Sequence, residues 1–418
     1  MRTTEHDNST ASLIIGGGHV GKMLSYDLLK NGVATTLATL SIESFEEIKT
    51  VKEQSISLKN ELTSEVELGE IHDLNLIMFH GREIDQALIK SKNIFICVPD
   101  IPVLRLEILK KIKNLDLHGK RFIFIRGGQG WIPYLATQLE ERYNPRDCSY
   151  LMIEDSLYGC RFVKNDVSYK RKFSVNVALL GIDFLDSINH IQNLLRNPSH
   201  PSWPSLVEVS PLGLMFDALG YIVHTAVILY EPNLEKTKAG ITYNHYIEGI
   251  NETLCARLEI LDQERVRLAK KFGATVMPFK ETLGRQYNVR VGDSLFDTLS
   301  ECTNVYKSSS PKDLNALKNS RAINEDISAL WVIQHLASLF PGEFDETLGY
   351  AKWIAAICDK EDIPIDILKY YALTIKIQAP TVKDFEDLFA SSDSLEFFAA
   401  NNLRKKHAPT SAWLNISI

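Results

Sequence analysis

The segment that offers the clearest acid–base chemistry is an apolar stretch at residues 211–232 with one histidine, His224. If this stretch is a single helix, Gly213, Asp217, Gly220 and His224 share one face, because they recur at spacings of four, three and four. Each glycine costs a helix about 1 kcal/mol relative to alanine, so we expect something to approach that face closely. Imidazole titrates near neutral pH and suits general acid–base catalysis. A core histidine between tightly packed helices is an equally good interpretation of this segment alone.

Two further polar segments follow along the chain. Arg321 and Asp326 lie in residues 319–328, where the spacing alone favours a solvated helix start with acidic residues near its N-terminus. Tyr246 lies in residues 244–250, which read as a polar surface loop. Neither segment predicts a catalytic site without further context.

A glycine-rich turn near the start of the chain predicts a nucleotide site. Gly16, Gly18 and Gly21 form G-x-G-x-x-G directly after an apolar run and before a helical pattern. In such a turn one glycine permits the bend, the second lets backbone N–H groups reach a pyrophosphate, and the third lets helix and strand pack closely. We therefore predict that Gly16, Gly18, His19, Val20 and Gly21 bind a dinucleotide, against the alternative of a purely structural turn.

The end of the second predicted strand bears on the choice of cofactor. An acidic residue there would bind the free 2′-hydroxyl of NAD, but the chain has Thr39 and Ser41 instead. We therefore expect NADP in preference to NAD, although no arginine lies in this stretch and an acid elsewhere could take the role. Pro99 and the glycines at 126–130 follow apolar runs, at the strand ends where open α/β sheets bind ligands. For those glycines a plain turn is an equally good interpretation.

Alternating elements must position these residues. Residues 12–41 read as strand, turn, helix and strand, and the apolar runs that follow are typical of buried parallel strands. The further strands that we expect are 74–79, 93–98, 121–126, 149–154 and 172–181, with a helix at 102–115. This alternation predicts an α/β domain with a Rossmann-type, doubly wound parallel sheet.

The pattern changes where prolines gather, at residues 197–205. Beyond it the chain reads as mostly α-helical, with an amphipathic helix at 251–273. We predict a loose N-terminus at 1–11, a nucleotide-binding domain at 12–200 and a helical catalytic domain at 201–418.

Composition excludes several classes of function. The 418 residues carry a net charge of −7, which argues against nucleic acid as a partner. The six cysteines form no CxxC pair and have no metal-ligand spacing, so we expect free thiols and no metal site. No signal peptide pattern and no apolar run of about 18 residues is present, so we expect a cytoplasmic protein without a membrane segment.

Taken in order, these segments resemble the opine dehydrogenase family, the octopine and nopaline type, with features similar to the staphylopine type that makes metallophores. The resemblance covers most of the chain. The segments that carry it after the glycine turn are DSLYGCR, which ends at Arg161, then IVHTA around His224, YIEGINETLCARLEILDQERVRLAKKFG, and SRAINEDISALWVIQHL.

The resemblance implies an NAD(P)H-dependent reductive condensation of an amino acid, or an amino-acid derivative, with an α-keto acid. It implies that His224 is the general acid–base and that Asp326 orients its ring. Arg321 would clamp a substrate carboxylate. The other substrate-binding residues that it implies are Arg161, Tyr246 and Gly220.

The sequence departs from the family pattern near the histidine. Gly220 stands where many members carry asparagine one turn earlier, and Thr225 replaces a proline that often follows. Asp217 is an alternative partner for His224. These differences leave the substrate class open.

Two other functions compete with this prediction. Another two-domain reductase, of the ketopantoate or 2-hydroxyacid type, would reduce a single carbonyl substrate without an amine, but no lysine lies in the segment around His224. A sensor that binds NAD(P)H without turnover is the third possibility. For the enzyme we expect a homodimer formed through the helical domain, and small-molecule substrates as its partners.

Overall fold

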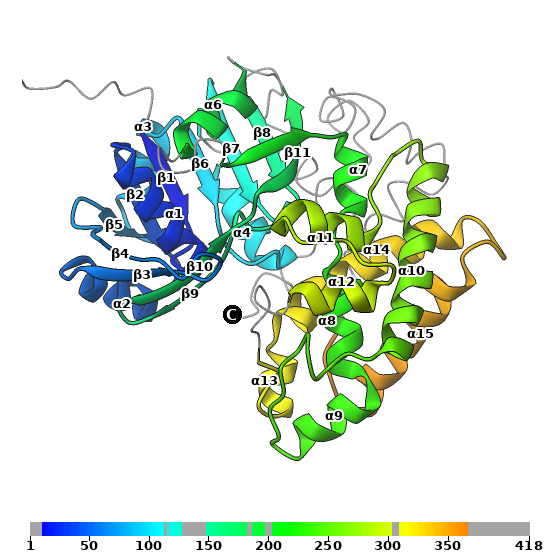
Figure 1. The fold of residues 1–418 in the computed structure, drawn as a ribbon. Coiled ribbons are helices and arrows are strands. Elements are labelled where there is room, and N and C mark those ends of the chain that lie inside the picture. Colours follow the sequence, from blue (N-terminus) through cyan, green and yellow to red (C-terminus); the bar gives the residue numbers. More distant parts are fainter. Residues whose placement is uncertain are drawn as a thin grey trace, which may run out of the picture. The chain divides into compact units, whose positions relative to one another are not determined.

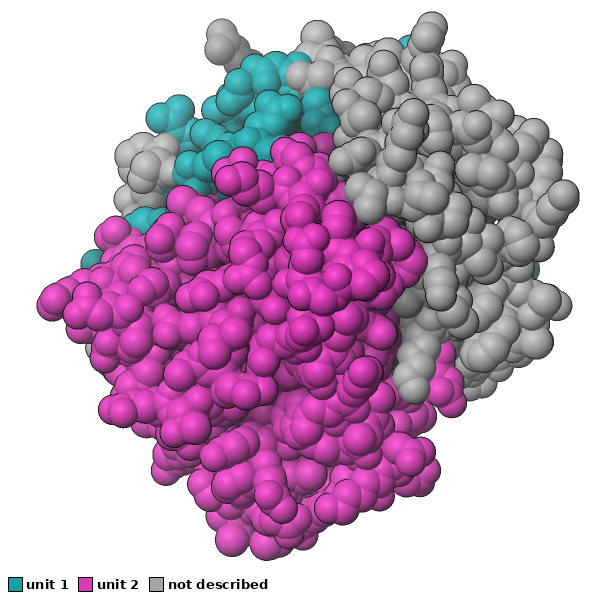
Figure 2. All heavy atoms as spheres, turned by 90° about the vertical axis from the view of Figure 1, so that its right-hand side faces the viewer, with its two compact units in different colours: residues 1–99, 104–127, 138–209 teal, residues 100–103, 128–137, 210–418 magenta. Residues whose placement is uncertain are grey.

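The computed structural model describes most of the chain as far as residue 366 (Figure 1). The described residues are 11–112, 115–116, 118–127, 148–181, 186–196, 203–302 and 309–366. The chain divides into two compact units (Figure 2). Unit 1 takes its residues from 1–99, 104–127 and 138–209, and unit 2 from 100–103, 128–137 and 210–418.

Unit 1 is built on an eight-stranded sheet (Figure 1). In spatial order its strands are β12 (Ser205–Glu208), β11 (Ser174–Gly181), β8 (Cys148–Ile153), β7 (Lys120–Ile125), β6 (Asn93–Ile96), β1 (Ser12–Ile15), β2 (Thr35–Thr39) and β5 (Asn75–Met78). Neighbours are parallel except β8 and β11, which are antiparallel. The chain runs from β1 first to β2 and β5, and then to β6 and β7 on the other side of β1. This reversal confirms the predicted doubly wound, Rossmann-type sheet.

Helices connect these strands. They are α1 (His19–Lys30), α2 (Ile42–Lys52), α3 (Ile84–Lys90), α4 (Pro102–Ile112) and α6 (Ser187–Leu195). The central strands are apolar because they are covered on both faces: Leu13, Ile14 and Ile15 of β1 are fully buried. The predicted sheet strands and the crossover helix are therefore present, with ends shifted by a few residues.

The sequence did not predict a second sheet in unit 1. Its strands, in spatial order, are β4 (Val66–Gly69), β3 (Ile56–Asn60), β10 (Asp166–Arg171) and β9 (Tyr158–Val163). A buried ion pair of 2.5 Å between Arg171 and Asp27 of α1, together with a 2.8 Å hydrogen bond from Tyr158 Oη to Asp27, ties this sheet to α1. Strand β3 pairs with β10, about a hundred residues further along the chain, and a local sequence pattern cannot predict such a long-range pairing.

The sheet also continues past the predicted domain boundary at residues 200 and 201. Strand β12 pairs with β11, and unit 1 extends to Val209. Part of the proline-rich segment, residues 197–202, lies outside the described residues. Prolines in this segment thus precede an edge strand of the first sheet rather than end the domain.

Unit 2 is helical (Figure 1). Its elements are α7 (Pro211–Phe216), α8 (Gly220–Leu229), α9 (Glu231–Lys238), α10 (Glu252–Lys271), α11 (Phe279–Tyr287), α12 (Leu295–Glu301), α13 (Leu314–Lys318), the π-helix η3 (Ala322–Asp326), α14 (Ile327–Ser338) and α15 (Asp345–Lys360). The predicted helix at 251–273 is α10. Its buried residues include Leu254, Leu258, Leu261 and Leu268, the apolar stripe of the sequence.

The segment 211–232 is not one helix, so the expectation of a single face from Gly213 to His224 is wrong. Helix α7 ends at Phe216, and α8 begins at Gly220. Asp217 caps α7, and its Oδ1 lies 3.9 Å from Nη1 of the buried Arg265. Asp217 thus lies near Arg265, whose closer ion-pair partner is Asp262 at 2.8 Å, and the carboxylate that contacts His224 is that of Asp326.

Three other findings concern the described residues alone. No single helix among them is long and apolar enough to span a bilayer, and the pair Gly213–Leu229 and Glu231–Lys238, bent by 61°, passes that test only when taken together. No group of three or more His, Cys, Asp or Glu side chains within the described ranges is placed to hold a metal ion. All six cysteines are free thiols.

Candidate active site

His224 and Asp326 meet in unit 2. Nδ1 of His224, from the middle of α8, lies 2.8 Å from Oδ2 of Asp326, the last residue of η3. The imidazole is 21% exposed, whereas the carboxylate is fully buried. A buried carboxylate facing Nδ1 holds that nitrogen as the N–H donor and stabilises the protonated ring. Nε2 is then the atom that can exchange a proton with a ligand.

The backbone around Asp326 makes this contact possible. A Cβ added to Gly220 would lie 2.2 Å from Oδ1 of Asp326, so only glycine leaves room for the carboxylate beside α8. Thr225 Oγ1 donates to the carbonyl oxygen of Ala322 at 3.2 Å and ties α8 to the π-helix. Gly220, predicted to bind substrate, lies against the carboxylate that contacts the histidine. Both departures from the family pattern thus serve the packing of α8 against η3.

Arg321 lies at the start of the same π-helix. Its Nε is 3.6 Å from Oδ1 of Asp326, and its side chain is 43% exposed. The segment 319–328 is therefore not a solvated helix start, since Asp326 is buried and bridges His224 and Arg321. A π-turn often occurs at functional sites, because it displaces side chains from the regular helical positions.

A pocket of about 330 Å³ adjoins these residues within unit 2. Its lining includes His224, Arg321, Tyr246 and His245. The Tyr246 ring is nearly perpendicular to both histidines, with centroids 6.0 Å from His224 and 4.6 Å from His245. Tyr246 is 6% exposed, so the expectation of a polar surface loop is wrong for this residue. His245 was missed, and only its place beside Tyr246 in the sequence could have suggested it.

The glycine turn has the geometry that its pattern predicts. Gly16 has φ +119°, and a Cβ there would lie 2.8 Å from the backbone of Cys97. A Cβ on Gly21 would lie 1.9 Å from the carbonyl oxygen of Gly16, so α1 packs directly on the turn. A Cβ on Gly18, the N-cap of α1, would meet nothing within 4 Å. Two glycines are thus required by packing, and the third leaves an open approach to the start of the helix.

The other residues predicted to bind the cofactor lie near this turn or at strand ends. His19 begins α1, and its Nδ1 accepts a 3.1 Å hydrogen bond from Phe162 N of β9. Val20 follows it in the first turn of α1, and Pro99 follows β6, with its carbonyl oxygen 3.3 Å from Nε of Arg105.

The two hydroxyl residues after β2 differ in their surroundings. Thr39 is fully buried, and its hydroxyl donates to Met78 Sδ at 3.3 Å. Ser41 is exposed and caps α2 by accepting from Ser44 N at 3.2 Å. Only one of the two hydroxyls that favoured NADP is therefore open to a ligand.

Arg161, predicted to bind substrate, lies in unit 1 on β9. Burial lowers the pKa of His19, and the positive charges of Lys22 and Arg161 lower it further. The charge of Arg161 therefore acts on His19, which directly follows the last residue of the glycine turn before α1.

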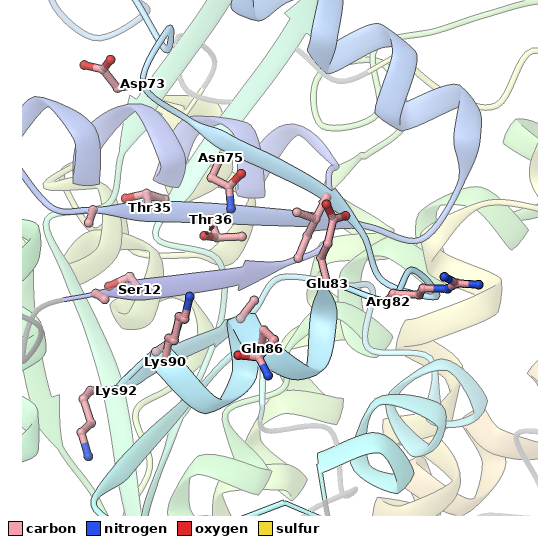
Figure 3. A pocket seen from close by; sticks show the side chains of 15 residues that line it. Ser12, Thr35, Thr36, Asp73, Asn75, Arg82, Glu83, Gln86, Lys90 and Lys92 are labelled. Atoms are coloured by element: carbon pink, nitrogen blue, oxygen red, sulfur yellow. Dashed lines mark hydrogen bonds between the residues drawn. The ribbon is translucent and has the colours of Figure 1, made fainter.

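A larger pocket of about 980 Å³ lies elsewhere in unit 1 (Figure 3). Ser12, Thr35 and Asn75 line it from the first residues of β1, β2 and β5, and Gln86 and Lys90 line it from α3. It therefore lies toward the amino ends of the strands, whereas the glycine turn follows the carboxyl end of β1. Ligands of doubly wound sheets bind at the carboxyl ends, so this pocket is not the predicted cofactor site.

One known protein family is similar to the helical part of this chain. A family described as NAD/NADP octopine/nopaline dehydrogenase, alpha-helical domain, matches residues 208–357, which contain His224, Arg321 and Asp326. The helical domain of this chain is therefore similar to that of octopine and nopaline dehydrogenases. No curated protein matches the sequence.

Several solved structures share the fold of this chain. Octopine dehydrogenase in complex with NADH and agmatine is 13% identical, with a TM-score of 0.65, over 94% of this chain and 98% of that one. Yersinopine dehydrogenase is 13% identical, with a TM-score of 0.59, over 96% and 99%. D-mandelate dehydrogenase with NADH and anilino(oxo)acetate reaches a TM-score of 0.52 at 11% identity, over 84% and 100%. At these identities the likeness establishes the fold.

Proposed function

We propose that this protein is an NAD(P)H-dependent opine-type dehydrogenase that joins the amine of an amino acid, or of an amino-acid derivative, to an α-keto acid. The observation that carries the proposal is the 2.8 Å contact of His224 with the buried Asp326, inside a domain of the octopine/nopaline type. Octopine dehydrogenase has been solved with NADH and agmatine, L-arginine or pyruvate. These are the two kinds of substrate that the proposal requires.

In the proposed reaction the amine attacks the keto carbon, the carbonyl oxygen leaves as water, and the resulting imine takes a hydride at carbon and a proton at nitrogen. The hydride would come from a reduced nicotinamide, which a dinucleotide held at the glycine turn would provide. Nε2 of His224 moves the protons of these steps, and Asp326 stabilises the ring while it is charged. Arg321 binds a substrate carboxylate as a charge-assisted hydrogen-bond donor.

The glycine turn fits a dinucleotide. The first turn of α1 has no side-chain cap, and the space beside Gly18 is open, so backbone N–H groups and the positive end of the helix can face a pyrophosphate. Because the hydroxyl of Thr39 is engaged with Met78, we propose NADH as the preferred cofactor, in place of the NADP that the sequence favoured. The relatives solved with NADH support this choice. Homodimerisation and a cytoplasmic location stay predictions from the sequence, which leaves open whether the product binds a metal.

The test is oxidation of NADH and NADPH, followed by absorbance, against a matrix of amino acids and α-keto acids. We expect oxidation only when an amine and a keto acid are both present, a lower KM for NADH than for NADPH, and loss of turnover in His224→Gln. Oxidation with a keto acid alone would instead support carbonyl reduction, the activity class suggested by the likeness to D-mandelate dehydrogenase. Binding of NADH without turnover of any pair would support the sensor.

A further inference from the structure

A second histidine lines the pocket beside His224. His245 is 6% exposed, and its ring lies 5.9 Å from that of His224, centroid to centroid. The preceding residue, Asn244, forms an isolated antiparallel β-bridge with Ser309. The imidazole therefore lies beside the ring of the proposed acid–base residue in an edge-to-face arrangement, yet the proposed reaction assigns it no part.

Two polar atoms of this pocket lack a hydrogen-bond partner. Nε2 of His245 and Oγ of Ser320 are both buried, and neither has a partner among the described residues. Both residues line the pocket. Buried polar groups are nearly always paired, because an unpaired one loses its hydration without compensation. A ligand in the pocket would restore both hydrogen bonds.

The charges around His245 indicate what kind of ligand this is. The pKa of His245 is lowered to about 3, mainly because the ring is buried; the charges of His224 and Arg321 contribute to the lowering, and the charge of Asp326 opposes it. The ring therefore stays neutral at physiological pH, with one nitrogen as donor and the other as acceptor. Arg321 lines the same pocket and is 43% exposed, whereas Asp326 is fully buried behind it, so the guanidinium is the charged group that an anionic ligand in the pocket can reach.

We propose that His245 binds the carboxylate of the α-keto acid. Nε2–H of the neutral ring donates to one carboxylate oxygen, Ser320 Oγ donates to the anion as well, and Arg321 supplies the charge. The inference rests on the proposed function, which brings the keto carbon to His224. A neutral donor suits this place, because it orients the anion without competing with His224 for the transferred proton.

The test compares two substitutions of His245 by calorimetric titration of the NADH-saturated protein with pyruvate. His245→Leu keeps most of the volume but removes the donor, whereas the side-chain nitrogen of glutamine reaches the position of Nε2. We expect His245→Leu to weaken pyruvate binding at least tenfold and His245→Gln to remain within about threefold of wild type, since tenfold corresponds to about 1.4 kcal/mol. The matched control is His190→Gln in α6 of unit 1, which we expect to bind pyruvate like wild type.

Kinetics give an independent readout. Loss of a carboxylate contact raises KM for the keto acid and leaves KM for the amine unchanged. Equal pyruvate affinity of wild type and His245→Leu, with both folded by their melting temperatures, would overturn the inference, as would the absence of pyruvate binding to wild type. Donor-dependent binding without any turnover would leave the inference standing and refute the proposed function. If the wild type turns over and His245→Leu binds pyruvate as tightly as wild type does, the proposed function stands and the inference is refuted.

Discussion

At the scale of single residues, the chemistry that we propose depends on one imidazole and one carboxylate. The sequence predicted both residues, because the resemblance placed them in family segments, but it left Asp217 open as the partner. In the structure Asp217 lies near Arg265, and Asp326 is the carboxylate that contacts His224. Spacing could not decide this, since 217 and 326 are both compatible with contact and only the tertiary fold separates them.

Replacing the carboxylate tests the pair directly. Asp326→Asn keeps the volume but removes the charge that stabilises protonated His224 and fixes its tautomer. We expect kcat to fall by about 10²–10⁴-fold, as for comparable His–carboxylate pairs, with NADH affinity unchanged by fluorescence titration. Asp293→Asn, an exposed residue of the same unit, is the matched control and should turn over like wild type. An unimpaired Asp326→Asn enzyme would show that the pair is structural.

Arg161 provides a second test at this scale. The sequence assigned it to the substrate, but its charge acts on His19 at the glycine turn. We expect Arg161→Ala to raise KM for NADH by about three- to tenfold, the value of one charge-assisted contact, and to leave KM for the keto acid unchanged. Steady-state kinetics with each substrate varied in turn would check this. A selective rise in KM for the keto acid would restore the original assignment.

At the scale of elements, the sequence predicted the helices and strands whose formation depends on the local pattern of apolar residues. Apolar runs gave the strands of the large sheet, and the stripe of leucines gave α10. The four-stranded sheet depends on pairing between distant segments, and the break between α7 and α8 places the buried Asp217 near Arg265 of α10. The π-helix η3 carries Asp326, which packs closely against Gly220 of α8. These features arise from tertiary contacts that periodicity does not encode.

Gly220 tests that fit. A methyl group there would lie 2.2 Å from Oδ1 of Asp326, so Gly220→Ala should force η3 away from α8. We expect it to destabilise the protein by about 1–3 kcal/mol and to lower kcat, because the carboxylate no longer reaches His224. The control is Gly349→Ala in α15, where a Cβ meets nothing within 4 Å and alanine should stabilise the helix by up to about 1 kcal/mol. Thermal melting distinguishes the two, and equal effects would refute the packing argument.

At the scale of the whole molecule, His245 links stability to pH. Its pKa is about 3 in the folded protein and near 6.5 when unfolded. As the pH falls from about 6.5 toward 3, the unfolded chain binds a proton that the folded chain refuses, so stability falls; above pH 6.5 this group contributes no change. We expect the melting temperature of wild type to drop more than that of His245→Gln between about pH 7 and pH 5. If the melting temperatures of both proteins fell equally with pH, protonation of His245 would not destabilise the folded protein, and the prediction would be wrong.

The central claim, that the nicotinamide hydride is delivered to an imine, is tested most directly by the fate of an isotope. The protein would be incubated with an amino acid, an α-keto acid and NADH deuterated at the transferred position, and the products analysed by mass spectrometry. The account predicts one deuterium on the carbon next to the new secondary amine, and none in the His224→Gln reaction. Deuterium in the 2-hydroxy acid, with the amine unconsumed, would contradict it.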